Sequence, residues 1–413
     1  MDKNKIIQPL KQTFIGFFKN TIAAEALTFW QRFQKCEHGG RSVHIMLGQH
    51  KIIVDEWAEV WDLLQPYADA SFWQMPDLDP ANVYIIGRVL LKENWQTITD
   101  WATRYPGRIV FSNPAEGSET IKLQLQRLRI ADLVRDGRMG LLTSGNLEPG
   151  IDYCQTDCYF SNIVEYTENR EAAELASAVR NVPEKIYDFL FLNGRLRPHR
   201  KYLIDRFRET GLLDRALWTN LNACVEMGFT SQLTVAQTEP IKLLPGIYEI
   251  PRALPNMATA PAHSFAKHHL FGNTWGDAII NPWAYVDTNF SVVTETIYDY
   301  PYTFRTEKIW KPMIMQHPFV AAANAGFYRD LHHAGFRTFG HLIDESFDSI
   351  DDPQQRADRL VEVVEDICYN GARSFMMASE EVCKYNQQHL VEHNQRERAR
   401  LPQRLEQYLN DRL

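Results

Sequence analysis

Short apolar runs alternate with helical stretches between about residues 42 and 145 of the chain. Turn-forming residues bound these runs, as in Arg104–Gly107 and Asn113–Gly117. This alternation is typical of a parallel sheet, and the polar loops at the ends of its strands are where such sheets bind ligands. The pattern predicts strands at Val43–Leu47, Val83–Ile86, Ile109–Ser112 and Gly140–Thr143.

A second alternating region follows the charged helical stretch Glu168–Arg180 and Pro183. Because 413 residues exceed the size of one ordinary hydrophobic core, this stretch predicts a domain boundary. The expected domains cover residues 1–178 and 179–375. In the second domain the predicted strands are Tyr187–Leu192, Ala216–Asn220 and Phe290–Thr294.

The C-terminal residues 376–413 are strongly helical, and we expect them to pack back on the first domain. Leu401, Leu405, Tyr408 and Leu409 recur at the spacing of one buried helix face. Pro402 predicts a break that divides this region into two helical pieces. The resulting fold class is α/β, with two Rossmann-like domains facing across a cleft and a C-terminal bridging helix.

The net charge of −8 argues against a polybasic membrane anchor and against binding of nucleic acid by the whole surface. We expect neither signal architecture nor an integral membrane segment at the N-terminus, because its apolar stretch Phe14–Phe18 is short and followed by Lys19. An amphipathic helix over Ile7–Phe33 is expected to pack on its own domain rather than on a membrane. The six cysteines show no repeated spacing, which indicates reduced thiols and a cytoplasmic location.

Three groups of potential metal ligands are interpreted as structural, so no metal is expected. Cys154 and Cys158 have no two further ligands nearby. Asp77-Leu78-Asp79 lies between two prolines and is interpreted as a turn. Three histidines lack carboxylates at ligand spacing, and these are His263, His268 and His269.

A basic segment, Phe191–Arg200, joins a predicted strand to a predicted helix. Gly194 lets the backbone approach a ligand closely, and Arg195 and Arg197 present guanidinium groups suited to phosphate oxygens. Cations are unfavourable at the start of a helix unless an anion offsets them. The segment therefore predicts an anion site, suited to a diphosphate, with a solvated helix start as the alternative.

An acidic strand end and a helix start form the second candidate, Phe290–Thr296 followed by Thr306–Pro312. Thr306 is a plausible helix cap, which leaves Glu307 and Lys308 in the first turn. There a carboxylate can accept ribose hydroxyls and an ammonium can contact phosphate. Taken alone, the segment would be interpreted as a routine capped helix, because capped helices are common.

Together, several segments resemble a group of glycosyltransferase-like proteins common in phage and bacterial genomes, whose donor half is similar to that of α1,3-fucosyltransferases. The resemblance covers roughly residues 185 to 370 and includes a T-E-K motif. The segments that carry it are Asn193–Arg195, Arg197–Arg200, Val293–Thr296, Arg305–Pro312, Gln316–Phe319, Gly335–Phe339 and Asp344–Asp348.

This resemblance implies a GT-B enzyme, with a nucleotide-sugar donor in the C-terminal domain and the acceptor in the N-terminal domain. It places Glu307 at ribose, Lys308 at phosphate and Glu295 near the sugar, and it implies no cofactor beyond the nucleotide-diphosphate sugar as co-substrate. The expected donor-binding residues are Asn193, Gly194, Arg195, Arg197, Glu295, Thr306, Glu307 and Lys308.

The expected reaction is a metal-independent, inverting transfer of a hexosyl or pentosyl group to an acceptor hydroxyl. Lys308 and Arg195 would stabilise the departing diphosphate, and Glu116, in the loop after Ile109–Ser112, is the best-placed base. The expected acceptor is a saccharide of a glycan, with a hydroxymethylated base in DNA as the alternative. A non-catalytic nucleotide-sugar-binding module and a sugar-phosphate enzyme of the related epimerase fold stay open as other classes.

Overall fold

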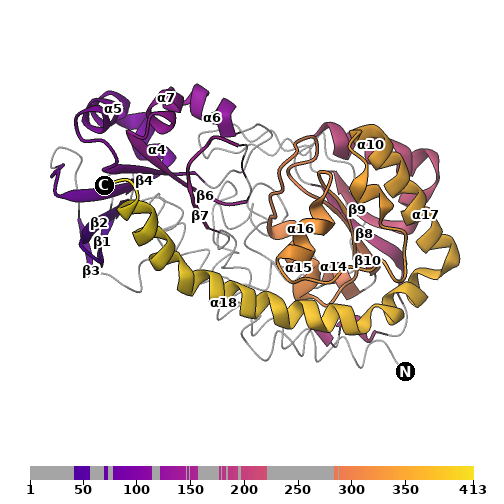
Figure 1. Cartoon of the computed structure of the whole chain (residues 1–413). Coiled ribbons are helices and arrows are strands. Elements are labelled where there is room, and N and C mark those ends of the chain that lie inside the picture. Colours follow the sequence, from indigo (N-terminus) through magenta and orange to yellow (C-terminus); the bar gives the residue numbers. More distant parts are fainter. Residues whose placement is uncertain are drawn as a thin grey trace, which may run out of the picture. The chain divides into compact units, whose positions relative to one another are not determined.

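The computed structural model describes residues 41–55, 69–72, 78–113, 121–145, 147, 149–156, 176–177, 179–182, 185–193, 197–220, 283–286 and 288–413. The chain divides into two compact units, which are drawn together in Figure 1. Unit 1 takes its described residues from Asn162–Pro301 and Arg305–Glu392. Unit 2 takes them from Arg32–Ser161, Tyr302–Phe304 and His393–Leu413.

Unit 2 contains a seven-stranded sheet in the order β3-β1-β2-β4-β5-β6-β7. The five strands from β2 to β7 in this order are parallel, whereas β1 is antiparallel to β2 and β3. The strands are β1 (Arg41–Leu47), β2 (His50–Asp55), β3 (Asp69–Phe72), β4 (Asn82–Ile86), β5 (Ile109–Ser112), β6 (Met139–Thr143) and β7 (Cys154–Gln155).

The four strands predicted in this region are confirmed, but the first is not part of the parallel arrangement. Leu47 pairs with His50, so only Gly48 and Gln49 connect β1 to β2. A two-residue link closes an antiparallel hairpin, whereas a parallel pair needs a crossover of a dozen or more residues. Gly48 adopts φ +55, a conformation that favours glycine in such a turn.

Helices between the strands cover one face of this sheet (Figure 1). Tyr84, Ile86 and Phe111 pack there in a buried cluster with Ile98 and Leu133. Because the parallel strands follow one another in chain order, right-handed crossovers place their helices on a single face. These helices are α4 (Arg88–Glu93), α5 (Trp95–Arg104), α6 (Ile121–Arg127) and α7 (Ala131–Arg135).

The C-terminal turns of helix α18 (Glu380–Asn410) cover the opposite face of the same sheet (Figure 1). Val83 and Val110 pack there against the helix. The backbone N–H of Leu141 donates to the Tyr408 hydroxyl at 3.0 Å, which anchors the helix to β6. The predicted buried helix face is confirmed, since the cluster includes Leu401, Leu405, Tyr408 and Leu409.

The predicted helix break at Pro402 is wrong, because α18 continues through this residue. A proline inside a helix removes one backbone hydrogen bond, at a cost of about 3 kcal/mol. The neighbouring Leu401 and Leu405 are buried against the sheet, which offsets this cost. The two C-terminal helices instead meet at Ser379, whose hydroxyl donates to the carbonyl of Met376 at 2.8 Å.

Unit 1 contains a four-stranded parallel sheet in the order β11-β10-β8-β9. From β8 the chain crosses to β9 on one side, whereas β10 and β11 lie on the other side. The strand order therefore reverses between β8 and β10. The strands are β8 (Tyr187–Asn193), β9 (Ala216–Asn220), β10 (Thr288–Thr294) and β11 (Phe319–Ala322).

Helices lie on both faces of this sheet, because crossovers in opposite directions place their helices on opposite faces (Figure 1). On one face, Phe189 and Phe290 stack at 5.5 Å and contact Phe207 of α10 and Phe375 of α17. The helical elements that the structure describes in unit 1 are α10 (Pro198–Glu209), η4 (Leu212–Arg215), α14 (Trp283–Val286), α15 (Glu307–Ile314), α16 (Phe327–His333), η6 (Ser346–Ser349), α17 (Pro353–Ala378) and the first turns of α18.

The α/β class is therefore confirmed, with parallel strands and intervening helices in both units. Cys154 lies in β7 and packs in the core with Leu142, as ordinary packing of this residue predicts, whereas Cys158 lies outside the described residues. Across the described ranges, none of the helices combines the length and the apolar composition needed to cross a bilayer.

Replacing Leu405 by Ala is expected to lower the free energy of unfolding by about 2–5 kcal/mol, because it leaves a cavity between α18 and the sheet. Urea denaturation followed by circular dichroism measures the change. Gln403→Ala is the control on the exposed side of the same helix, with an expected effect within about 0.5 kcal/mol. Equal effects of the two changes would contradict this packing.

Candidate functional site

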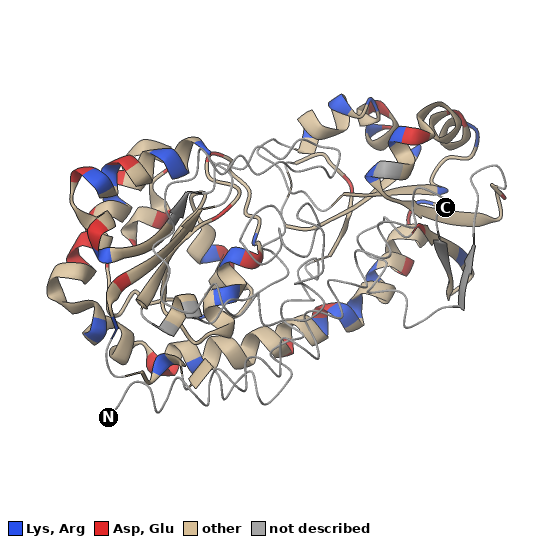
Figure 2. Ribbon diagram, turned by 180° about the vertical axis from the view of Figure 1, so that it is seen from behind, with Lys and Arg blue, Asp and Glu red and all other residues tan. Residues whose placement is uncertain are grey.

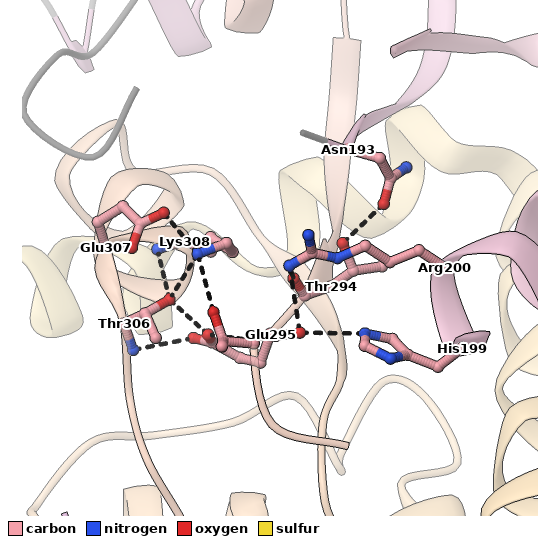
Figure 3. A network of polar contacts seen from close by, with 9 residues as sticks. Asn193, His199, Arg200, Thr294, Glu295, Thr306, Glu307 and Lys308 are labelled. Atoms are coloured by element: carbon pink, nitrogen blue, oxygen red, sulfur yellow. Dashed lines mark hydrogen bonds and ion pairs between the residues drawn. The ribbon is translucent and has the colours of Figure 1, made fainter. Parts of the chain in front are cut away.

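The candidate site lies at the carboxyl ends of β8 and β10, where the strand order reverses. In open α/β sheets, ligands bind outside the carboxyl ends of the strands at such a reversal. Asn193 ends β8 and Thr294 ends β10, and the Thr294 hydroxyl donates to the Asn193 side-chain carbonyl at 2.8 Å. Figure 3 shows this pair beside the polar network that follows β10.

Glu295 is the centre of this network, and its side chain is 0% exposed. Its carboxylate accepts hydrogen bonds from the Thr306 hydroxyl at 2.5 Å, from the Thr306 N–H at 3.2 Å and from the Thr296 N–H at 3.2 Å. Burial raises the pKa of Glu295, while the charge of Lys308 and the bonds from Thr306 act in the opposite direction. A carboxylate in this position ties the end of β10 to the start of α15.

The backbone carbonyl of Glu295 is held from the opposite side by the start of α10 (Figure 3). It accepts from His199 Nε2 at 3.1 Å and from the Arg200 guanidinium at 3.3 Å, and Arg200 also donates to the Thr294 carbonyl at 3.0 Å. Burial, followed by the charge of Arg200, lowers the pKa of His199 to about 3. His199 is therefore neutral at pH 7, with its Nε2 proton donated to this carbonyl.

Tyr298 packs against His199. The two rings stack in parallel with their centroids 4.7 Å apart. The Arg356 guanidinium lies 4.5 Å from the centroid of the Tyr298 ring and donates to the Tyr298 carbonyl at 2.7 Å. The loop after Glu295 is thereby fixed by side chains of both α10 and α17.

Thr306 is the N-cap of α15, as predicted from the sequence, and its hydroxyl accepts from the Lys308 N–H at 3.3 Å. The Lys308 ammonium donates to Glu307 Oε1 at 2.6 Å, to Thr306 Oγ1 at 3.2 Å and to Thr296 Oγ1 at 3.3 Å. The Lys308 side chain is 26% exposed, so the ammonium is partly accessible to solvent. Two of its three bonds are long and go to neutral hydroxyls.

Glu307 differs from Glu295 both in its partners and in the direction of its pKa shift. Burial alone would raise the pKa of Glu307, but the charges of Lys308 and Lys311 outweigh it and the pKa is lowered. The difference has a simple cause, because Lys308 contacts Glu307 directly and reaches Glu295 only through the Thr306 hydroxyl. Glu307 Oε2 is buried without a hydrogen-bond partner. The side chain thus presents one unused acceptor next to a cation.

The two candidate segments of the sequence converge on the same strand end. His199 and Arg200 come from the basic segment, and Thr306 and Lys308 come from the T-E-K segment. All four bond to Glu295 or Thr296. Sequence reasoning included His199 and Arg200 only as members of a basic run, and it missed their role as donors to a backbone carbonyl.

The other predicted site residues lie outside the described residues or at the start of α10. Gly194, Arg195 and Glu116 lie outside the described residues, whereas Arg197 is half-buried at the N-cap position of α10. Beyond its first turn, α10 carries exposed charges of both signs that pair along the helix, as Lys201 does with Asp205 at 2.5 Å (Figure 2). These later cations of α10 form a solvated face.

The predicted turn at Asp79 is confirmed, because its carboxylate accepts from the Ala81 N–H at 2.9 Å. Asp77 and the three histidines His263, His268 and His269 lie outside the described residues. In the part of the chain that the structure describes, no three His, Cys, Asp or Glu side chains are grouped so that they could hold a metal ion.

Comparisons of the chain with protein-family models, with curated proteins and with solved structures found no significant match.

The raised pKa of Glu295 predicts a pH dependence of stability. At a pH between its ordinary pKa of 4.5 and its raised pKa in the folded state, the folded protein retains a proton on Glu295 that the unfolded chain has lost. The free energy of unfolding therefore falls as pH rises through the window between the unfolded and folded pKa values. Glu295→Gln should reduce this decline in urea denaturation at several pH values. Glu93→Gln, at an exposed position, should retain it, and an unchanged profile in Glu295→Gln would contradict the burial of this charge.

Proposed function

We propose that this protein is a glycosyltransferase, which transfers a sugar from a nucleotide-diphosphate donor to an acceptor hydroxyl. The observation that carries the proposal is the coincidence of two features. The strand order of unit 1 reverses between β8 and β10, and a network of Glu295, Thr306, Glu307 and Lys308 lies at the end of β10. The resemblance of the T-E-K segment to fucosyltransferase-like proteins supports the same conclusion.

Lys308 is proposed to bind the diphosphate and to stabilise its charge as the glycosidic bond breaks. Its bonds to the hydroxyls of Thr296 and Thr306 are 3.3 and 3.2 Å long, so they are the ones most readily exchanged for phosphate oxygens. The shorter bond to Glu307 keeps the ammonium oriented during this exchange. Because Lys308 and Arg195 would stabilise the charge of the leaving group, we propose that the reaction is metal-independent.

Glu307 is proposed to bind the ribose of the donor. Its Oε1 is engaged by Lys308, whereas the buried Oε2 has no hydrogen-bond partner. A buried acceptor without a partner costs free energy, and a ribose hydroxyl would remove that cost by donating to it. We assign the remaining contacts with the nucleotide-sugar donor to Asn193, Gly194, Arg197 and Glu295. Of these residues, Glu295 is proposed to lie near the sugar.

The full proposal follows the GT-B type, with two Rossmann-like domains facing across a cleft and an acceptor bound by the N-terminal domain. An inverting transfer requires a base at the acceptor hydroxyl, for which we propose Glu116. The proposed acceptor is a glycan saccharide, the only co-substrate is the nucleotide sugar, and the proposed location is the cytoplasm.

Replacing Lys308 by Ala is expected to lower turnover by about 10²–10³, because the developing charge on the diphosphate loses its cation. Release of nucleoside diphosphate from a panel of nucleotide sugars, with and without acceptor, measures this rate. Lys201→Ala is the matched control, since this exposed lysine pairs only with Asp205 of its own helix. Equal activity of the Lys308 and Lys201 variants would defeat the proposal.

A further inference from the structure

Among the described residues of unit 2, three buried hydroxyl groups have oxygens without a hydrogen-bond partner. They belong to Ser112, Thr143 and Ser144, which are 2%, 0% and 4% exposed. Buried polar side chains in folded proteins almost always have a partner, so each exception calls for an explanation. Three exceptions close together indicate more than an isolated packing fault.

The three residues lie at one edge of the sheet, at the carboxyl ends of the adjacent strands β5 and β6. Ser112 pairs in register with Leu142, so Thr143 and Ser144 follow directly beside it. Backbone bonds continue the sheet at this edge, since Asn113 N–H donates to the Leu142 carbonyl and Thr156 N–H to the Thr143 carbonyl, each at 2.9 Å. The side-chain hydroxyls of Ser112, Thr143 and Ser144 have no such partners.

These hydroxyls interrupt a pattern that is otherwise apolar. The preceding residues of β5 and β6 include Ile109, Val110, Phe111 and Leu141, all of which are buried in the two core clusters. Valine or alanine would fill the same positions without leaving a polar atom unpaired. The carboxyl edge of parallel strands is also where α/β sheets bind ligands.

We propose that this edge binds a neutral polyhydroxylated ligand, and that the ligand is the saccharide acceptor of the proposed glycosyltransferase. A hydroxyl both donates and accepts, which matches the hydroxyls of a sugar. Phosphate and carboxylate ligands instead require cations or clustered backbone N–H groups. The identification of the saccharide as an acceptor rests on the proposed function. The proposal that this hydroxyl edge binds a polyhydroxylated ligand does not.

Two aromatic residues of unit 2 lie next to this edge. Gly145 follows Ser144 with φ +75, and a Cβ atom at this glycine would lie 2.9 Å from the Phe304 ring and from the Thr303 carbonyl. The Tyr153 hydroxyl donates to the Gly145 carbonyl at 3.4 Å. Aromatic walls with a few polar groups are typical of small-molecule sites. The three oxygens are covered, so a ligand reaches them only when part of this surrounding chain moves.

The test combines ligand binding with stability for the full-length protein. The probes are the methyl glycosides of glucose, galactose, mannose and N-acetylglucosamine, titrated by saturation-transfer NMR. The wild type is expected to bind at least one of them, and Thr143→Val and Ser112→Ala should each weaken that binding at least tenfold. Because these changes remove unpaired hydroxyls, the melting temperature should stay equal or rise.

Thr99→Val is the matched control, since the Thr99 hydroxyl has a partner and donates to the Gln96 carbonyl at 3.1 Å. This change should lower the melting temperature without altering glycoside binding. Failure of the wild type to bind any of the four glycosides would overturn the inference. So would wild-type affinity in Thr143→Val, or a loss of stability in it as large as in Thr99→Val.

A titration of the same samples with nucleoside diphosphates separates this inference from the proposed function. Binding of glycosides without binding of any nucleotide or nucleotide sugar would support the hydroxyl edge and defeat the glycosyltransferase proposal. Binding of nucleotides without binding of any of the glycosides would overturn the proposal that this edge binds a saccharide. The proposed donor site would be unaffected by that result.

Discussion

The candidate site depends on the burial of one carboxylate, that of Glu295. A buried charge is tolerated only when hydrogen bonds and nearby opposite charge replace its lost hydration. Thr306 supplies two of the bonds, and its hydroxyl in turn accepts from the Lys308 ammonium. Satisfying Glu295 therefore fixes where α15 begins and where its first-turn cation points. On the other side, His199 and Arg200 hold the carbonyl of the same residue.

A second constraint governs unit 2, where the parallel strands follow one another in chain order and the described helices α4 to α7 between them lie on one face. The other face stays apolar and must be covered by a different part of the chain. The C-terminal turns of α18 supply that cover, which explains why this helix continues through Pro402. In the same sheet, the apolar strands β5 and β6 end at buried hydroxyls.

Periodic and local features were predictable from the sequence, whereas contacts between distant segments were not. The apolar strands, the Thr306 cap and the stripe through Leu405 follow from spacing, because each depends on neighbouring residues. The role of His199 as a carbonyl donor depends on the pairing of β8 with β10, which no local pattern encodes. Ser112 and Thr143 likewise resemble ordinary strand ends until their surroundings are known. At Pro402, burial against the sheet outweighed a local helix-breaking preference.

The most direct test of the account is a crystal structure of the full-length protein with a bound nucleoside diphosphate. The account predicts that the terminal phosphate contacts the Lys308 ammonium in place of a threonine hydroxyl, and that a ribose hydroxyl donates to Glu307 Oε2. A nucleotide bound elsewhere, with Lys308 still bonded to Thr296, Thr306 and Glu307, would contradict it.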